Sequence, residues 1–204
     1  MRSLSQDDRP VGLRERKKAR THAAIRQHAM RLFREQGYGA TTVEQIAEAA
    51  EVSPSTFFRY FSTKEELVLQ DDYDPLLVEA FKAQPPELSP IAALRASLRT
   101  VFGELSAEQL ALERERYALI RSAPELRAGM LDEYTRTVRL LAELVAERVG
   151  RRADELAVRT LAGALIGVAM SAMLTWAEDP AADAADYLAL LDAAMAHLEA
   201  GLPL

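Results

Sequence analysis

The stretch TTVEQIAEAAEVSPSTFFRYFSTKEEL, residues 41–67, decides the fold that is predicted for this chain. Its first part carries an apolar face at helical spacing, formed by Val43, Ile46, Ala47 and Ala50. Ser53 followed by Pro54 is typical of an N-cap and a first helical turn, so a second short helix begins there. Two short helices joined by a tight turn at 51–52 have the geometry of a helix-turn-helix, whose second helix enters the major groove of DNA.

Start and stop signals extend this pattern on both sides. A long helix begins at Leu13, and Gly37 is its expected stop; its apolar face is Ile25, Ala29, Leu32 and Phe33. Capping boxes are predicted at Thr41 with Glu44 and at Ser62 with Glu65. The second box opens a helix that we expect to continue through Leu67 and Leu77 to about Phe81.

The remainder of the chain is predicted to be helical as well. Its 204 residues include 36 Ala and 29 Leu, both strong helix formers, and only 9 Gly and 9 Pro. Prolines mark a linker at 83–90, and helices are expected near 90–105, 107–122, 124–149, 154–177 and 183–200. The fold class is therefore all-α. We expect a disordered arm at 1–12, a DNA-binding domain at 13–69 with its helix-turn-helix at 41–60, and a regulatory and dimerisation domain at 70–204.

Charge is distributed unevenly between these parts. Residues 1–64 carry 12 Lys and Arg against 7 Asp and Glu, a net of +5, whereas residues 65–204 carry 13 against 24, a net of −11. Between Arg9 and Arg34 there are nine basic residues, and Glu15 is the single acidic one. A basic head on an acidic body indicates nucleic-acid binding at one end.

The second short helix has the composition of a recognition helix. Phe57 and Phe61 are four residues apart and are expected to anchor it inward, which leaves Phe58, Arg59 and Tyr60 nearer the open face. Arg59 can reach a base or a phosphate, and a tyrosine hydroxyl can donate to a phosphate.

Residues 18–69 resemble the DNA-binding domain of the TetR family of bacterial transcriptional regulators. The matching pieces are GYGATTVEQIAEAA, VSPSTFFRYF and STKEEL. The resemblance implies a helical C-terminal domain that dimerises and often holds a ligand. The FFRYF and DYDPLL segments and the Ala- and Leu-rich final helices are also similar to a subgroup named after a mycofactocin-system regulator, some members of which respond to acyl-coenzyme A.

By matching position, the resemblance also implies a set of DNA contacts. Thr42, Tyr60 and Lys64 would bind phosphate, Lys64 with help from the N-terminus of its helix. The flanking backbone would be reached by Arg16, Lys17, Lys18 and Arg20, and base edges by Ser53, Pro54, Ser55, Thr56 and Arg59. Two positions depart from the family pattern. Glu51 stands where glycine is usual in the turn, at a cost of about 1 kcal/mol if φ is positive, and Phe58 lacks the hydroxyl of the usual tyrosine.

The C-terminal half offers candidates for a ligand pocket and a dimer interface. Aromatic and Met side chains suit an adaptable apolar pocket, although each is also a plausible core residue; the candidates are Phe102, Tyr117, Arg121, Met130, Tyr134, Met170, Met173 and Trp176. Arg121 either meets an anionic ligand group or bridges to a glutamate. A four-helix dimer interface is expected from Gly163, Gly167, Leu188, Leu191, Met195 and Leu198.

Other classes of protein have little support in the sequence. The absence of Cys excludes thiolate chemistry, and His22, His28 and His197 lack metal-ligand spacing, so neither a metal nor a cofactor is expected. Pairs of acidic residues, Glu65 with Glu66 and Glu113 with Glu115, are interpreted as solvated helix surface. The uncharged run 160–177 is long enough for a membrane span, but its Gly, Ser, Thr and Ala content favours a helix buried in the core or at a subunit interface. The absence of Cys also fits a reducing cytoplasm, and the N-terminus lacks an apolar signal core.

We therefore expect a dimeric regulator, most simply a repressor, that a small apolar or amphipathic molecule releases from operator DNA; an acyl-CoA-like compound is one such molecule. Two alternatives stay open at this stage. The first is an architectural DNA-binding protein without a ligand. The second is an acyl-group carrier or enzyme, which would leave the basic head unexplained.

Overall fold

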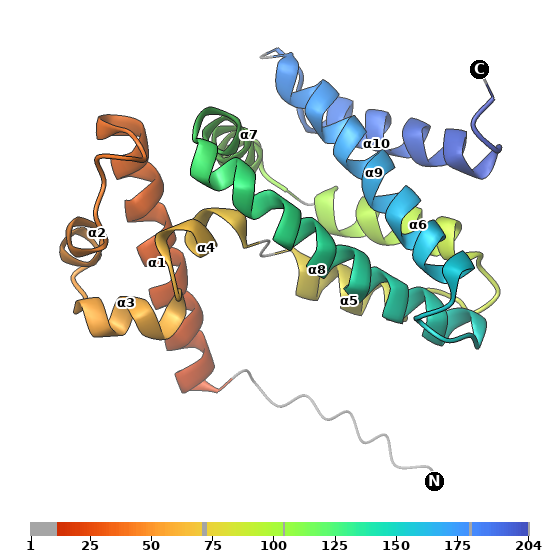
Figure 1. The fold of residues 1–204 in the computed structure, drawn as a ribbon, viewed down its shortest axis with the longest axis horizontal. Coiled ribbons are helices and arrows are strands. Elements are labelled where there is room, and N and C mark those ends of the chain that lie inside the picture. The colour runs from red at the N-terminus through yellow and green to blue at the C-terminus, as the bar shows by residue number, and fades with distance from the viewer. Residues whose placement is uncertain (1–11, 71–72, 104, 180, 204) are drawn as a thin grey trace, which may run out of the picture. The chain divides into compact units, whose positions relative to one another are not determined.

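The computed structural model describes residues 12–70, 73–103, 105–179 and 181–203, and these residues form ten helices and no strand. The all-α class is confirmed. The chain divides into two compact units, residues 1–68 and 69–204, whose helices are shown in Figure 1. Of the predicted arm at 1–12, only Gly12 lies within the described residues.

The head is built from short helices around a long one: α1 (Leu13–Gln36), α2 (Val43–Ala49), α3 (Pro54–Tyr60) and α4 (Lys64–Leu69). Ile25, Ala29 and Phe33 on α1 are buried, as their spacing predicts. The ring of Phe61 is fully buried, and its centroid lies 4.4 Å from that of His22 on α1. Burial of this apolar face supplies most of the stability of helices that are too short to form alone.

The N-cap of α2 lies one residue later than predicted. Thr42 is the N-cap, and its side chain forms a capping box with Gln45. Thr41 is buried instead, and its hydroxyl donates to the carbonyl oxygen of Gly37 at 2.8 Å. Both threonines can cap a helix, and burial of the first leaves the role to the second.

The start of α4 is shifted by one residue in the same direction. Thr63 Oγ1 accepts a hydrogen bond from the backbone N–H of Glu66 at 3.0 Å, so Thr63 rather than Ser62 caps this helix. The backbone N–H of Ser62 donates to the Glu66 carboxylate at 2.6 Å. Glu65, the predicted partner of Ser62, accepts from the Tyr38 hydroxyl.

The long helix expected from residue 62 to about 81 is two helices. The first, α4, ends at Leu69, and α5 (Asp74–Lys82) begins with a proline in its first turn. Proline has no N–H to donate, and in the first turn of a helix that N–H would have no partner within the helix. Pro75 therefore suits the start of a helix and not its interior.

The second unit consists of α5 and five further helices, whose bounds lie within a few residues of those predicted: α6 (Pro90–Phe102), α7 (Ala107–Ser122), α8 (Pro124–Val149), α9 (Leu156–Glu178) and α10 (Ala184–Glu199). Ser89, Ser106 and Asp183 cap three of them. The helix α9 packs against both α8 and α10, as Figure 1 shows. It contributes Ala162 and Leu165 to the core, so the uncharged run 160–177 within this helix is partly buried in its own protomer.

Arg148 on α8 holds the proline-rich linker between α5 and α6. Its guanidinium donates to the carbonyl oxygens of Leu88 at 3.1 Å and Phe81 at 3.3 Å, and also to that of Pro85. Its central carbon lies 5.1 Å from the Phe81 ring centroid. A cation at the end of α5 also opposes the partial negative charge of the helix C-terminus.

Candidate DNA-binding surface and ligand cavity

The helix α3 begins as the sequence predicts. Ser53 is its N-cap and accepts from the backbone N–H of Thr56 at 3.1 Å. The Ser53 hydroxyl also lies 2.9 Å from the hydroxyls of Ser55 and Thr56. Ser53, Pro54 and Ser55 are exposed, so a small polar surface is presented at the start of this helix.

Phe57 and Phe61 are fully buried and anchor α3, as predicted. Between them, Phe58 is 53% exposed and Arg59 is exposed, while Tyr60 is half-buried. The guanidinium carbon of Arg59 lies 5.4 Å from the Tyr60 ring centroid. The anchors thus fix the rotation of the helix, and this rotation turns Arg59 outward.

The turn between α2 and α3 contains a residue with a positive φ, at the position where the family usually has glycine. Glu51 has a φ of 53°, in the left-handed region. The backbone N–H of Val52 donates to Ala47 O at 2.9 Å, and that of Glu51 donates to Glu48 O at 3.0 Å. These two bonds form a Schellman motif, in which the left-handed position is usually glycine.

The predicted backbone contacts on α1 and α2 are accessible. Arg16, Lys17, Lys18 and Arg20 are exposed on the first turns of α1, and Thr42 is exposed at the start of α2. Exposed lysines and arginines can pair with phosphates without first being freed from a buried site, which suits a backbone contact.

Lys64 is placed differently from the other predicted phosphate contacts. Its ammonium group donates to the carbonyl oxygens of Tyr38 and Thr41, both at 2.9 Å, and lies 4.1 Å from the Tyr38 ring centroid. Lys64 therefore ties the start of α4 to the loop between α1 and α2. Its neighbour Glu65 is half-buried rather than solvated; burial raises its pKa, but hydrogen bonds from the backbone and the Tyr38 hydroxyl bring that pKa below its ordinary value.

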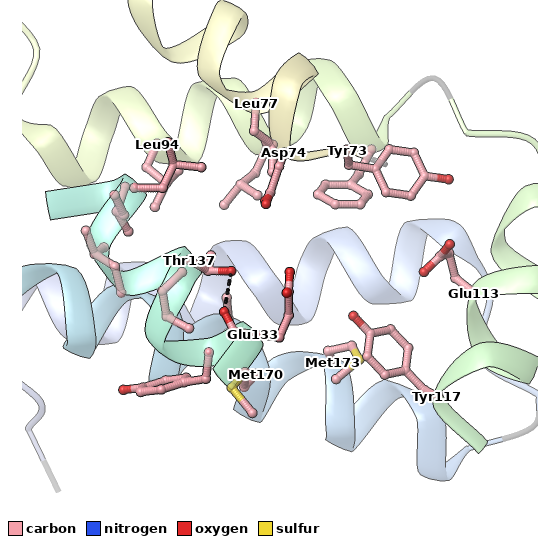
Figure 2. A pocket seen from close by; sticks show the side chains of 18 of the residues that line it. Tyr73, Asp74, Leu77, Leu94, Glu113, Tyr117, Glu133, Thr137, Met170 and Met173 are labelled. Atoms are coloured by element: carbon pink, nitrogen blue, oxygen red, sulfur yellow. Dashed lines mark hydrogen bonds between the residues drawn. The ribbon is translucent and has the colours of Figure 1, made fainter. Parts of the chain in front are cut away.

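The second unit encloses a cavity of about 220 Å³. Side chains from α5 to α10 line it, and most are apolar, among them Leu77 and Leu94 from α5 and α6 and Met170 and Met173 from α9. Figure 2 shows these groups gathered around one space, with Asp74 and Glu133 pointing towards the interior from opposite sides. An apolar cavity with a few polar groups is the usual form of a small-molecule site.

Most of the ligand candidates from the sequence lie on this cavity, namely Phe102, Tyr117, Met130, Tyr134, Met170, Met173 and Trp176. Arg121 does not line it. Its side chain is 55% exposed and lies 4.0 Å from the Glu178 carboxylate. Of the two roles predicted for Arg121, the structure therefore shows the bridge to a glutamate.

Several polar residues of the cavity were missed or misread in the sequence. The side chain of Arg116 is 6% exposed, and it pairs at 2.8 Å with Glu113, for which the sequence predicts a solvated position. Asp74 and Glu133 line the cavity as well and are bridged by Arg136. Glu113 and Arg116 are three residues apart on α7, a spacing that predicts an ion pair. The same spacing occurs in ion pairs on solvated helices, so it did not indicate that this pair is buried.

Of the residues predicted for a dimer interface, some face the core of their own protomer and others are exposed or half-buried. Leu191 and Met195 are buried in the core of their own protomer, so they are not available to a partner. A Cβ at Gly163 would lie 3.7 Å from the Tyr134 hydroxyl, so this glycine also faces inward. Gly167 is exposed, and Leu188 and Leu198 are half-buried. Helical spacing alone does not tell which stripe of an Ala- and Leu-rich helix faces its own core.

Two further observations concern metal-ligand groups and membrane-spanning helices among the described residues. Among them, no three His, Asp or Glu side chains are grouped as metal ligands. Within the same residues, α9 alone has the length and apolar composition of a membrane span, but its side chains also contribute to the core.

A helix-turn-helix with an exposed recognition helix, joined to a helical domain with an apolar cavity, defines a DNA-binding transcriptional regulator. Comparison with known proteins supports this class. Residues 25–70 match the profile of bacterial regulatory proteins of the tetR family, and residues 88–203 match that of the MftR C-terminal domain.

Individual relatives agree with both matches. The chain is 38% identical to the HTH-type transcriptional regulator TcmR of Streptomyces glaucescens over 71% of its own length and 67% of that protein. It is 29% identical to the transcriptional regulator MftR of Mycobacterium tuberculosis over 80% and 83% of the two chains. FadR of Thermus thermophilus, a TetR family repressor solved with lauroyl-CoA, is 26% identical with a TM-score of 0.55, covering 90% and 95% of the chains. The chain therefore belongs to the TetR family of transcriptional regulators and has a C-terminal domain of the MftR type.

Proposed function

We propose that this regulator is a repressor that a small apolar or amphipathic molecule, bound in the C-terminal cavity, releases from its operator. The observation that carries the proposal is the largely apolar cavity of about 220 Å³ on the same chain as a DNA-binding head. Acyl-CoA-like compounds are one candidate class, supported by the lauroyl-CoA complex of the similar Thermus thermophilus protein. The site of action is the cytoplasm, where operator DNA lies.

The DNA contacts are proposed from exposure and position. Arg59, Ser53, Pro54, Ser55 and Thr56 face base edges. Phosphates are bound by Arg16, Lys17, Lys18, Arg20, Thr42 and Tyr60. We assign Lys64 to holding the loop before α2, because two carbonyl oxygens already occupy its ammonium group.

The mechanism is a coupling between two states of a dimer. Members of this family bind as dimers, and we propose that the exposed face of α9, which includes Gly167, and the half-buried Leu188 and Leu198 of α10 contribute to the interface. A ligand that prefers the arrangement of the two heads that does not fit the operator lowers operator affinity by its difference in affinity for the two states.

The test is release from a defined operator. Selection on randomised DNA supplies the operator, and fluorescence anisotropy then follows the full-length protein on it. Lauroyl-CoA, and any molecule that mass spectrometry finds after native purification, are titrated into the complex. Ala169 lines the cavity, so Ala169→Phe is expected to retain operator affinity but to abolish release by the ligand. Ala111→Phe, at an exposed position on α7, is the control and is expected to retain both operator affinity and release.

An opposite result points to one of the alternatives. If native mass spectrometry shows a fully occupied cavity while operator affinity stays unchanged, the release mechanism is wrong. That outcome favours a ligand-independent architectural protein. Failure to select any DNA sequence, together with turnover of a bound acyl group, would instead favour a carrier or an enzyme.

A further inference from the structure

One wall of the cavity is a chain of aromatic rings, drawn from the residue that precedes α5 and from α6, α9 and α10. Ring centroids lie 5.2 Å apart for Tyr73 and Phe102, 5.6 Å for Phe102 and Tyr187, and 5.2 Å for Tyr187 and Trp176. All four residues line the cavity, as does Tyr117 on α7, and Figure 2 shows Tyr73 and Tyr117 beside it. Such a wall offers ring faces and edges to a flat aromatic ligand, since aromatic rings pair favourably in offset-stacked and edge-to-face arrangements.

The charged lining is acidic on balance. Three carboxylates line the cavity, those of Asp74, Glu113 and Glu133, with side chains 13%, 17% and 26% exposed. Arg116 is the single cation among the lining residues of the described chain. Arg136, which bridges Asp74 and Glu133, is half exposed and is not part of the lining.

This balance selects against an anionic ligand. Among the lining residues themselves, the carboxylates outnumber the cation three to one. Two further arginines lie outside the lining: Arg136 pairs with Asp74 and Glu133, and the guanidinium carbon of Arg114 lies 4.2 Å from the Trp176 ring centroid. An entering carboxylate or phosphate would lose its hydration and meet like charge in a region of low dielectric constant. A hydroxyl group, in contrast, can donate to a carboxylate oxygen and form a charge-assisted hydrogen bond, which is about twice as strong as a neutral one.

We infer that the part of the ligand buried in this cavity is an uncharged aromatic ring system that bears hydroxyl groups, rather than a carboxylate or another anion. The inference rests on the proposed function, because it names the class of ligand for the same cavity. The rings stack within the wall formed by Tyr73, Phe102, Tyr187 and Trp176. The hydroxyls donate to Glu133 and Asp74, which point into the space from opposite sides.

The protein carries its own reporter for the test. Trp176 is the single tryptophan of the chain, is 2% exposed and lines the cavity. A quinone that binds against it quenches its fluorescence. The probes are 2-(hydroxymethyl)anthraquinone and anthraquinone-2-carboxylate, which share one ring system and differ in charge, with lauroyl-CoA as a third probe and calorimetry as a second measurement.

The full-length protein is expected to bind the neutral quinone at least about tenfold more tightly than the carboxylate, a difference of about 1.4 kcal/mol. Glu133→Gln removes one negative charge from the lining and should narrow that ratio to about threefold or less. Asp132→Asn is the matched control, because it removes a negative charge from an exposed position on the same helix. The ratio should stay unchanged in this control.

The outcomes separate the inference from the proposed function. If anthraquinone-2-carboxylate binds as tightly as the neutral quinone, or if Asp132→Asn narrows the ratio as much as Glu133→Gln, the inference is overturned. If lauroyl-CoA binds and releases the operator while both quinones fail, the inference is also overturned and the proposed function stands. If the quinones show the expected ratio but leave operator binding unchanged, the ligand class is supported and the proposed release mechanism fails.

Discussion

Glu51 carries backbone strain in the turn between α2 and α3. It adopts a φ of 53° because the Schellman motif after α2 requires a left-handed residue there. A Cβ in this conformation costs about 1–2 kcal/mol. The strain persists because the turn sets the direction in which α3 leaves α2, and α3 must bury Phe57 and Phe61.

Replacing Glu51 by glycine is expected to raise the free energy of unfolding by about 0.5–1 kcal/mol, because relief of strain exceeds the added entropy of the unfolded chain. Urea unfolding followed by circular dichroism measures this change. Glu48→Gly serves as the control; it lies inside α2 and should lower stability by about 1 kcal/mol. Equal effects of the two substitutions would show that the turn is not strained.

Lys64 and Arg20 are both basic residues of the head, but their surroundings predict different roles. Lys64→Ala should lower the thermal stability of the protein, since two carbonyl oxygens lose their donor. It should leave the slope of log affinity against log salt unchanged. Arg20→Ala should flatten this slope by about one unit without loss of stability. A flatter slope for Lys64→Ala would return Lys64 to the phosphate contacts.

At the scale of the elements, an ion-pair network joins α6 to α10. Arg95 donates from Nε and Nη2 to the two carboxylate oxygens of Asp192, at 3.0 and 2.8 Å, and from Nη1 to Glu199 at 2.9 Å. The hydrogen bond from Arg95 holds the pKa of Asp192 below its ordinary value, against the opposing effect of burial. A bidentate pair of this kind fixes the register of two helices as well as their distance.

Asp192→Asn is therefore expected to lower the free energy of unfolding at pH 7 by about 1 kcal/mol, allowing for partial exposure to solvent. Because the folded-state pKa is depressed, this contribution is complete above the ordinary aspartate pKa of about 3.9 and is lost as the pH falls through the lower folded value. Urea unfolding of the parent protein and of Asp192→Asn should show a smaller difference in the free energy of unfolding at pH 3 than at pH 7. Glu178→Gln, at a loose and exposed pair, should cost less than about 0.5 kcal/mol. If Asp192→Asn lowered the free energy of unfolding by the same amount at both pH values, the ionised pair would not stabilise the fold.

At the scale of the whole molecule, we expect two copies of the head to read DNA together, because regulators of the TetR family typically dimerise. Family membership implies a twofold-symmetric dimer, so the operator should contain two inverted half-sites. In such a dimer, the exposed Arg59 is proposed to contact the same base position in each half-site.

Arg59→Ala should relax sequence preference at one position in both half-sites, because a bidentate contact to guanine is worth about 1–3 kcal/mol. Tyr60→Phe should weaken binding by about 1 kcal/mol and keep the preferred sequence, since it removes a hydroxyl assigned to phosphate. Selection on randomised DNA with the parent and both variants measures this. If Arg59→Ala weakens every site equally, Arg59 is a backbone contact, and specificity falls to Ser53–Thr56 and to DNA shape.

The sequence by itself determined the class of fold, the bounds of most helices and the family. Start signals such as Ser53–Pro54 act within three or four residues, and apolar periodicity within three or four turns, so both can be recognised without knowledge of the rest of the chain. The same locality explains the errors in the caps. Thr41 and Thr42 are equivalent as caps, and the choice between them depends on which one is buried by the surrounding head.

Which residues line the cavity was decided by the tertiary structure alone. Tyr73, Phe102 and Tyr187 are far apart in sequence. They meet because the packing of the core brings the start of α5 together with α6 and α10. The same rotation turns Glu113 and Arg116 inward, leaves Arg121 outside, and buries Leu191 and Met195 in their own protomer. A helix rich in Ala and Leu has several faces that can be buried, and the face that is buried depends on the side chains of distant helices that fill the space against it.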